Sequence, residues 1–481
     1  MNMSYSQWIA GEFRQGSCAQ HFIVINPSTG QPLGDYAHAT QADVQAAIDA
    51  AGEALRTWRK TSALERSTML RRVAALMRER GDAIGTQIAL ELGKPLGEAQ
   101  KEVVTAAEMF EWAAEEARRL YGRTIPARTA GITQTVVLEP VGVVAAFAGW
   151  NAPAITPARK ISGALAAGCT IVIKPSEETA GVALHIAHAV QDAGVPDGVV
   201  NMVFGDPGAI ADQLCSSPQV AMVTFTGATS VGKQIGAQAA GTMKRATLEL
   251  GGHAPVIVCD DLDAADVARV ARMAVATKYR NAGQVCTSPT RFLVQAGVFD
   301  TFCSHFVQAA EALKVGDPFD AATHMGPLKN QRRIQVIDQL VQDARSRGLT
   351  IATGGERIGT EGFFYRPTVI VQPSVDCDAA NVEPFGPVAL ISPFVELEEA
   401  IVEANRLPFG LASYAFTNHL GRAHRLASEI DSGVVCINEW QASLPETPFG
   451  GHKDSGLGSE GGIEGLQEFL RVKCVRLGVS A

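Results

Sequence analysis

One cysteine of this chain lies in a stretch whose composition suits a reactive thiol. Cys286 ends the run YRNAGQVC, which begins at Tyr279 and carries small and polar residues instead of a continuous apolar segment. A nucleophilic cysteine needs an accessible thiolate, a base, and hydrogen-bond donors for the oxyanion that forms when a carbonyl is attacked. The chain has 9 cysteines without paired CxxC spacing. We therefore interpret the others as small buried side chains and predict neither a disulfide framework nor a metal site.

Two further residues could supply the base and the oxyanion donor. Glu249 lies in the apolar stretch LELGG, where burial would raise the pKa of its carboxyl and suit it to proton abstraction. Asn151 follows an apolar run in GWNAP, so its amide could donate to an oxyanion. Each has an ordinary structural alternative, because Asn is common in turns and a glutamate before two glycines can simply pair with a lysine.

Two segments resemble phosphate-binding loops, but only one of them follows an apolar strand. The run from Gly456 to Gly461 matches GxGxxG, although no apolar strand leads into it. The run from Gly227 to Lys233 nearly matches a Walker A loop, yet Gln234 stands where the magnesium-binding hydroxyl belongs, which disfavours a nucleotide triphosphatase. A strand from Val223 to Phe225 does run into Thr226 and then a helix. Such a helix N-terminus suits a pyrophosphate without any metal.

A lysine and a carboxylate end another expected strand. Lys174 and Glu177 lie in IKPSE, at what would be the carboxyl edge of a parallel sheet. In that position they could hold ribose hydroxyls. A solvated charge pair is an equally acceptable interpretation of the same residues.

The elements that must position these residues follow two patterns. Residues 43–80 show helical spacing, with Ser62 and Glu65 as a capping box. After Val141, short apolar runs alternate with helical stretches, which is typical of a parallel sheet covered on both faces. The expected strands are 141–147, 171–174, 199–203 and 221–225, and the expected helices are 158–167, 179–193, 208–214 and 230–239. A second α/β series follows, with strands expected at 256–258, 291–294, 369–371, 388–394 and 434–438.

Composition excludes several classes of protein. The 481 residues, 46% of them hydrophobic, can fill large cores in two or three domains. The net charge of -9 comes without a basic run that could neutralise a line of phosphates, so nucleic acid is not an expected partner. No window of about 18 apolar residues indicates a membrane span, and residues 1–20 lack a targeting pattern. We therefore expect a cytoplasmic protein.

Seven ordered segments together resemble the aldehyde dehydrogenase superfamily over nearly the whole chain. They are GWNAP from Gly149, KPSE from Lys174, FTGAT from Phe225, LELGG from Leu248, GQVC from Gly283, EPFGP from Glu383 and PFGG from Pro448. The resemblance implies an α/β fold with a Rossmann-like parallel-sheet cofactor domain, a second α/β catalytic domain and a small β extension for oligomerisation. The implied limits are 1–124 and 142–251, 252–450, and 125–141 with 463–481, respectively.

The resemblance also implies a role for each site residue. Cys286 would attack the aldehyde, while Asn151 and the backbone N–H of Cys286 would stabilise the oxyanion. The thiohemiacetal would transfer hydride to a nicotinamide, and Glu249 would activate the water that hydrolyses the thioester. The implied cofactor contacts are Trp150, Lys174, Ser176, Glu177, Phe225, Thr226, Gly227, Ala228, Val231, Leu250, Glu383 and Phe385. Because a carboxylate at Glu177 would repel a 2′-phosphate, NAD is the expected cofactor, with NADP as the alternative.

The substrate is expected to be an aldehyde with a terminal acid. The segments 111–122 and 280–284 resemble the succinate-semialdehyde dehydrogenase branch, in which two arginines grip the substrate carboxylate. The matching residues are Arg159 and Arg280, and the alternative is that they pair with structural carboxylates. Ala152 replaces the family's usual phenylalanine and removes a ring from the aldehyde tunnel, whereas Trp440 could return apolar surface. Aromatic and medium-chain aldehydes therefore stay open.

Three further expectations concern assembly, redox control and neighbouring activities. Strands at 131–139 and 471–477 are expected to pair across subunits, giving a homodimer or homotetramer. Ser288 occupies the position of a second cysteine that some relatives use as a redox switch, so no such switch is expected. Glu249 argues against a coenzyme A-acylating dehydrogenase, and Cys286 with Glu249 argues against a non-catalytic relative.

Overall fold

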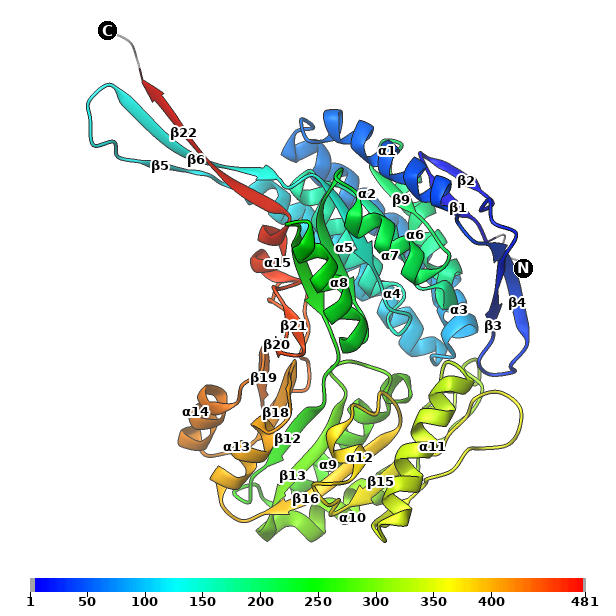
Figure 1. Ribbon diagram of the computed structural model, residues 1–481. Helices are drawn as coiled ribbons and strands as arrows, with labels where there is room; N and C mark the ends of the chain where they lie inside the picture. The colour runs from blue at the N-terminus through cyan, green and yellow to red at the C-terminus, as the bar shows by residue number, and fades with distance from the viewer. Residues whose placement is uncertain (1–4, 479–481) are drawn as a thin grey trace.

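The computed structural model describes residues 5–478. Two large sheets covered by helices form the upper and lower parts of the molecule in Figure 1, and a narrow three-stranded extension projects from the upper part. The α/β class and the three-part architecture expected from the sequence are thus observed. Residues 1–4 of the expected cofactor domain and 479–481 of the expected extension lie outside the described residues.

The upper sheet has eight strands in the order β2-β1-β9-β8-β7-β10-β11-β21. Its five middle strands run parallel, and the first four of them along the chain correspond to strands that the sequence predicted. They are β7 (Val143–Phe147), β8 (Thr170–Lys174), β9 (Val200–Met202), β10 (Val220–Thr226) and β11 (Arg245–Glu249). The antiparallel edges were not expected: β1 (Gln7–Ile9) and β2 (Glu12–Arg14) on one side, and β21 (Gly456–Leu457) on the other.

Alternate residues of this sheet enter two different cores. Val143, Ala145 and Phe147 of β7 pack into one hydrophobic cluster, and Val144 and Ala146 pack into the other. The first cluster is covered by α1 (Gln41–Trp58), α7 (Pro207–Ser216) and α8 (Thr229–Gly241). The second is covered by α2 (Ala63–Glu79), α3 (Gly81–Leu92), α4 (Leu96–Glu116), α5 (Ile155–Ala167) and α6 (Ala180–Asp192). The capping box of Ser62 and Glu65 begins α2 as expected.

The lower sheet has seven strands in the order β14-β15-β16-β13-β12-β18-β19. The five expected strands are present as β12 (Ala254–Val258), β13 (Pro289–Gln295), β15 (Thr368–Val371), β16 (Val388–Phe394) and β19 (Val434–Ile437). The strands β14 (Thr350–Thr353) and β18 (Ala412–Phe416) were not expected. The helices of this part are α9 (Ala264–Tyr279), α10 (Phe299–Glu311), α11 (Gln331–Ser346), α12 (Asp378–Asn381), α13 (Leu397–Asn405) and α14 (Leu420–Glu429).

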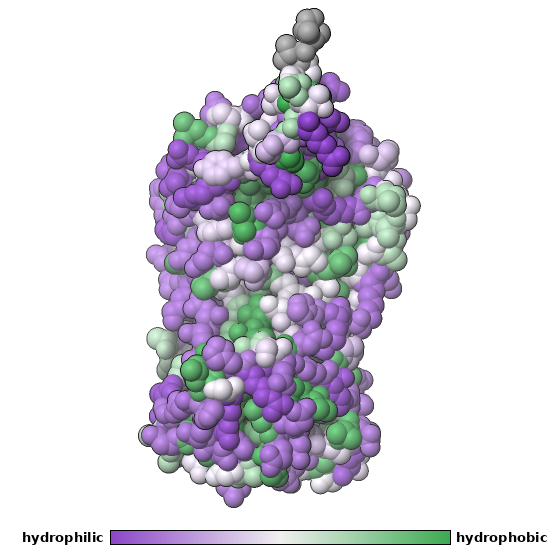
Figure 2. Space-filling view, turned by 90° about the vertical axis from the view of Figure 1, so that its left-hand side faces the viewer, coloured by the Kyte–Doolittle hydropathy of each residue, from purple (hydrophilic) through white to green (hydrophobic). Residues whose placement is uncertain are grey.

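The extension is a narrow sheet in the order β22-β6-β5. Its strands are β5 (Arg123–Ile125), β6 (Ile132–Pro140) and β22 (Leu470–Gly478), which follows α15 (Gly462–Glu468). The strands β6 and β22 pair antiparallel along their whole length, so both expected extension strands are observed. Figure 1 shows the extension standing clear of the body, and in Figure 2 pale and green residues gather at mid-height among mostly hydrophilic ones.

The remaining strands form two short antiparallel pairs, β3 (His21–Ile25) with β4 (Pro32–Ala37) and β17 (Phe409–Gly410) with β20 (His452–Lys453).

Within residues 5–478, no helix is both long and apolar enough to cross a membrane.

Candidate active site

A cavity of about 910 Å³ is lined by residues from both large parts of the molecule. Side chains at the carboxyl ends of β7, β8, β10 and β11 line one portion, and α4, α5 and the segment 280–287 line another. The cavity brings together nearly all the residues that the sequence singled out, Lys174 and Trp440 being the exceptions. The expected residues on its wall are Trp150, Asn151, Arg159, Ser176, Glu177, Phe225, Thr226, Gly227, Ala228, Val231, Glu249, Leu250, Arg280, Cys286, Glu383 and Phe385.

Cys286 is placed by a strained turn that follows α9. Asn281, Ala282 and Gly283 have φ values of 49°, 54° and 73°, in the left-handed region that residues with a Cβ rarely occupy. Hydrogen bonds hold the turn, because Asn281 Nδ2 donates to the Asn151 carbonyl at 3.1 Å and Asn281 N donates to Glu98 Oε2 at 3.2 Å. The same Asn281 side chain therefore ties the nucleophile's loop to the segment that carries Asn151.

Glycine is required at the last position of this turn. A Cβ on Gly283 would lie 2.2 Å from the Gly386 carbonyl oxygen. Beyond the turn, Tyr414 Oη donates to the Thr287 carbonyl at 2.8 Å and fixes the residue after the thiol. The sequence around Cys286 is thus determined by backbone geometry as well as by chemistry.

Glu249 ends β11 beside the thiol. Its side chain is 3% exposed, and its Oε1 finds no hydrogen-bond partner among the described residues. Burial and the nearby charge of Glu460 raise the pKa of Glu249 to about 7. Burial and the neighbouring Glu249 raise the pKa of the Cys286 thiol well above its ordinary value. The carboxyl of Glu249 and the thiol of Cys286 thus lie close enough for a proton to pass between them.

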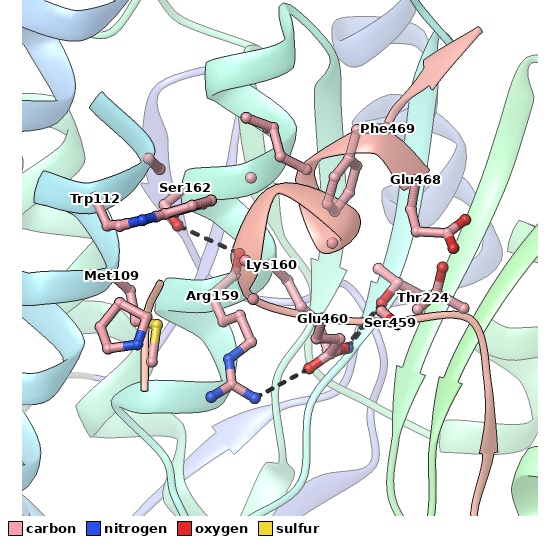
Figure 3. A pocket seen from close by; sticks show the side chains of 18 residues that line it. Met109, Trp112, Arg159, Lys160, Ser162, Thr224, Ser459, Glu460, Glu468 and Phe469 are labelled. Carbon is pink, nitrogen blue, oxygen red and sulfur yellow. Dashed lines mark hydrogen bonds and ion pairs between the residues drawn. The ribbon is translucent and has the colours of Figure 1, made fainter. Parts of the chain in front are cut away.

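A buried ion cluster of Arg159, Lys160 and Glu460 lies near Glu249, and the sequence did not indicate roles for Lys160 and Glu460 in it. Arg159 Nη1 lies 3.5 Å from Glu460 Oε2, and Lys160 Nζ lies 2.5 Å from Glu460 Oε1. Figure 3 shows Arg159 and Glu460 facing each other beside Lys160 and Thr224. Burial opposes ionisation of Glu460, but Lys160 and Arg159 lower its pKa, so it stays charged. That fixed negative charge is one reason why Glu249 holds its proton more tightly than a free carboxyl.

Another buried pair supports the segment after Asn151. Lys94 Nζ forms an ion pair with Glu102, and Glu102 Oε1 accepts a hydrogen bond from Ala154 N at 2.9 Å. Lys94 Nζ also donates to the Asn151 carbonyl at 3.4 Å. The side chain of Asn151 itself lines the cavity. No sequence pattern identified Lys94 or Glu102, because neither is near Asn151 in the chain.

Glycine-rich turns leave open space where β10 and β11 end. The segment from Thr226 leads into α8, whose N-terminus meets the cavity. A Cβ at Gly251 would lie 2.4 Å from Glu383 Oε2, so glycine alone leaves room there. Glu383 is held in place because its Oε1 accepts from Gly252 N at 3.1 Å. An open cradle, a helix N-terminus and a fixed carboxylate fit a pyrophosphate and a ribose.

Further contacts fix the remaining residues near this cradle. Lys174 Nζ lies 2.5 Å from Glu177 Oε2, so the expected pair forms; Glu177 faces the cavity while Lys174 is buried beneath it. The rings of Trp150 and Phe385 meet edge to face at 5.5 Å. Lys233, which suggested a Walker A loop, instead forms an exposed ion pair with Asp454.

Comparison with known proteins agrees with this geometry. The model of the aldehyde dehydrogenase family matches residues 13–475. The chain belongs to the aldehyde dehydrogenase family. The fold and the enzyme class expected from the sequence, an NAD(P)-dependent aldehyde dehydrogenase, are thereby confirmed.

Three relatives illustrate the similarity. A 4-(hydroxymethyl)benzenesulfonate dehydrogenase of Comamonas testosteroni is 43% identical over 97% of this chain and 96% of its own. An NADP-dependent succinate-semialdehyde dehydrogenase of Escherichia coli K12 is 40% identical over 98% of this chain and 97% of its own. The crystal structure of a succinate-semialdehyde dehydrogenase from Burkholderia pseudomallei is 40% identical, with a TM-score of 0.96 over 99% of this chain and 98% of its own.

The two arginines expected to bind substrate have different environments in this aldehyde dehydrogenase. Arg159 is largely buried, donates to Ser443 Oγ at 2.8 Å, and lies over the Phe449 ring at 5.0 Å. Arg280 is exposed at the cavity and forms no ion pair within residues 5–478. The structural alternative therefore describes Arg159 better than it describes Arg280.

The structure places Trp440 away from the wall of this cavity. Its ring packs 4.5 Å from Phe416 and 5.3 Å from Tyr414, against the core of the lower part. It is not among the residues of the cavity wall. The loop residue that reaches the wall is Ser443, three positions later, which a sequence pattern does not distinguish from Trp440.

Proposed function

We propose that this aldehyde dehydrogenase oxidises an aldehyde that carries a terminal anionic group, such as succinic semialdehyde, to the carboxylic acid. The observation that carries the proposal is Arg280, an exposed arginine on the cavity wall that forms no ion pair within residues 5–478. A guanidinium in that position can bind a carboxylate in a bidentate manner. The name of the Escherichia coli relative points to the same class of substrate.

The residues of the cavity wall support the following catalytic roles. Cys286 attacks the aldehyde carbon, and the amide of Asn151 with the backbone N–H of Cys286 stabilises the oxyanion. A bound nicotinamide cofactor supplies the hydride acceptor. Glu249 then accepts a proton from the water that hydrolyses the Cys286 thioester, which fits a buried carboxyl with a pKa of about 7.

The cofactor is proposed to be held at the carboxyl edge of the upper sheet. The turn from Thr226 and the start of α8 would bind the pyrophosphate. Glu177, with Lys174 paired to it, would bind the adenosine ribose, and Glu383 the nicotinamide ribose. NAD is preferred over NADP in this proposal, because Glu177 faces the cavity where a 2′-phosphate would have to lie. The Escherichia coli relative is named as NADP-dependent, so the choice must be measured on this chain.

Aromatic aldehydes are a second candidate class, favoured by two observations. The Comamonas testosteroni relative is named for a sulfonated benzyl compound, and Ala152 lines the cavity with only a methyl group. An aromatic ring that bears a terminal anion would fill the space beside Ala152 and bind Arg280.

The test is NADH or NADPH formation with a panel of aldehydes, with and without coenzyme A. Succinic semialdehyde, 4-formylbenzoate, benzaldehyde and a series of neutral aliphatic aldehydes separate the candidates. We expect anionic aldehydes to give the highest kcat/KM, without any need for coenzyme A. A Cys286→Ala variant must lose turnover with all of them, and activity that survives this change would refute the mechanism.

Assembly, domain limits and location complete the proposal. We propose that β6 and β22 pair or pack across subunits in a homodimer or homotetramer, which sedimentation at micromolar concentration would test. The domain limits 1–124 with 142–251, 252–450, and 125–141 with 463–481 stay predictions, and so does the cytoplasmic location.

A further inference from the structure

One face of α4 forms part of the same cavity wall as Arg280. Glu98, Lys101, Glu102 and Thr105 follow the spacing i, i+3, i+4, i+7, which places them on a single face of a helix. All four line the cavity that contains Cys286. Glu102 is buried and engaged with Lys94, but Lys101 is exposed. The helix therefore presents a lysine to the open part of the cavity.

Lys101 and Arg280 lie around the same carboxyl group. Burial raises the pKa of Glu98, while the charges of Lys94, Arg280 and Lys101 oppose that rise. One oxygen of Glu98 is already engaged, because it accepts from the backbone N of Asn281. Within residues 5–478, neither Lys101 nor Arg280 forms an ion pair or a side-chain hydrogen bond of its own.

The deeper cation of the cavity is differently placed. Arg159 is 11% exposed, and its guanidinium is shared between Glu460, Ser443 and the Phe449 ring. A substrate anion that reached Arg159 would compete with a buried carboxylate already 3.5 Å away. At the exposed end of the wall, by contrast, neither Lys101 nor Arg280 forms an ion pair within residues 5–478.

We propose that Lys101 and Arg280 together form the subsite that binds the distal anionic group of the substrate. The inference rests on the proposed function and deepens it. The group recognised is a carboxylate or a sulfonate at the end of the substrate opposite the aldehyde, and it extends to the cavity mouth. Lys101 acts as a point charge, while Arg280 supplies directed hydrogen bonds. Lys101 is thus a specificity-determining residue that takes no part in bond making.

The test compares anionic aldehydes with neutral aldehydes of similar shape. The pairs are 4-formylbenzoate with its methyl ester, 4-formylbenzenesulfonate with 4-(methylsulfonyl)benzaldehyde, and succinic semialdehyde with butanal. Lys101→Met keeps the length of the side chain and the helix propensity of the site, so the fold should be retained. Lys60→Met, which removes an exposed positive charge that is not on the cavity wall, is the matched control.

We expect Lys101→Met to lower kcat/KM for the anionic member of each pair by roughly five- to twenty-fold, as for loss of one charge-assisted contact in a solvated site. The neutral members should change by less than about twofold, and Lys60→Met should leave every ratio unaltered. Added salt should weaken the anionic preference of the wild type more than that of Lys101→Met. Comparison of the carboxylate and sulfonate arms tells which anion the subsite prefers.

Two results would overturn the inference. One is an unchanged anionic-to-neutral ratio in Lys101→Met while Arg280→Met abolishes the preference, which would leave the proposed function standing without Lys101. The other is an equal loss for anionic and neutral substrates, which would indicate a merely structural role for Lys101. Failure of the proposed function is distinct, because the wild type would then favour neutral aldehydes or oxidise none.

Discussion

Replacing Glu249 by glutamine separates the two steps in which this carboxyl could take part. The substitution preserves the size of the side chain but removes its ability to accept a proton from water. If Glu249 is the base for hydrolysis, Cys286 still forms the thioester and releases one equivalent of NADH, after which the enzyme stalls. Because a positioned general base contributes roughly 10²- to 10⁴-fold, we expect the steady-state rate to fall by about that factor while the NADH burst persists.

The pH dependence of the hydrolysis rate tests the role of Glu249 independently. Since the pKa of Glu249 is raised to about 7, the wild-type hydrolysis rate should rise as the pH increases through about 7, where the carboxyl ionises. The glutamine variant should lack this rise. Its residual rate should be flat across the same range.

The raised pKa also has a consequence for stability. The difference between the ordinary value of 4.5 and about 7 corresponds to about 3 kcal/mol in the free energy of unfolding. For a carboxyl whose pKa is raised by folding, this stabilisation is complete below pH 4.5 and is lost as the pH rises through about 7. Between pH 4.5 and pH 8 the wild type should therefore lose up to about 3 kcal/mol of stability through Glu249. Glu249→Gln should not show this pH-dependent loss, because glutamine does not titrate.

Stopped-flow absorbance of NADH, with a large excess of aldehyde, measures the burst and the steady state in one experiment. Cys286→Ala serves as the control, because it must show neither phase. Equal loss of burst and steady-state rate in Glu249→Gln would refute the reasoning. Glu249 would then act mainly to activate the thiol, a role that its closeness to Cys286 permits.

Three further predictions test other parts of the site. Glu177→Gln should shift the ratio of kcat/KM for NAD over that for NADP towards NADP by about tenfold, as measured by initial rates, since one repulsive charge near the 2′-phosphate is removed. Glu460→Gln should lower the pKa of Glu249 and move the rising limb of the rate profile to lower pH, because the negative charge that raises it is lost; an unmoved profile would contradict this. Gly283→Ala should destabilise the protein by roughly 1–3 kcal/mol and slow thiol labelling of Cys286, because a Cβ would meet the Gly386 carbonyl at 2.2 Å.

The central strands of both sheets could be predicted because their burial leaves a continuous apolar signal. Strands such as β7 and β12 are buried along their full length, so every position is apolar. The edge strands β1, β2 and β21 are two or three residues long, too short for any period to emerge. The strand β18 was missed for another reason, since its sequence ASYAF mixes small and polar residues although all five are buried.

The site residues that could be predicted lie in contiguous motifs at strand ends. Asn151, Glu249 and Cys286 each have neighbours in sequence that reveal the turn or the burial. Glu460 has no such neighbours, and its place in a GxGxxG run even suggested a different role. Its function depends on Lys160, which is three hundred residues away in the chain. Lys94 and Glu102 were missed for the same reason, because their importance comes from tertiary contacts alone.

Arg159 and Arg280 had the same predicted role, but the fold gives them different environments. From the sequence, Arg159 and Arg280 were equivalent candidates for one substrate carboxylate. The fold gives Arg159 a buried carboxylate and an aromatic face, whereas it leaves Arg280 exposed beside a carboxyl whose pKa is raised. An arginine that is already paired inside the protein must share or give up that pairing to bind a second anion, whereas an exposed arginine without an ion pair has none to lose. The anionic group of the substrate should therefore bind at the mouth of the cavity. The preferred aldehyde should be long enough to reach from Cys286 to that position.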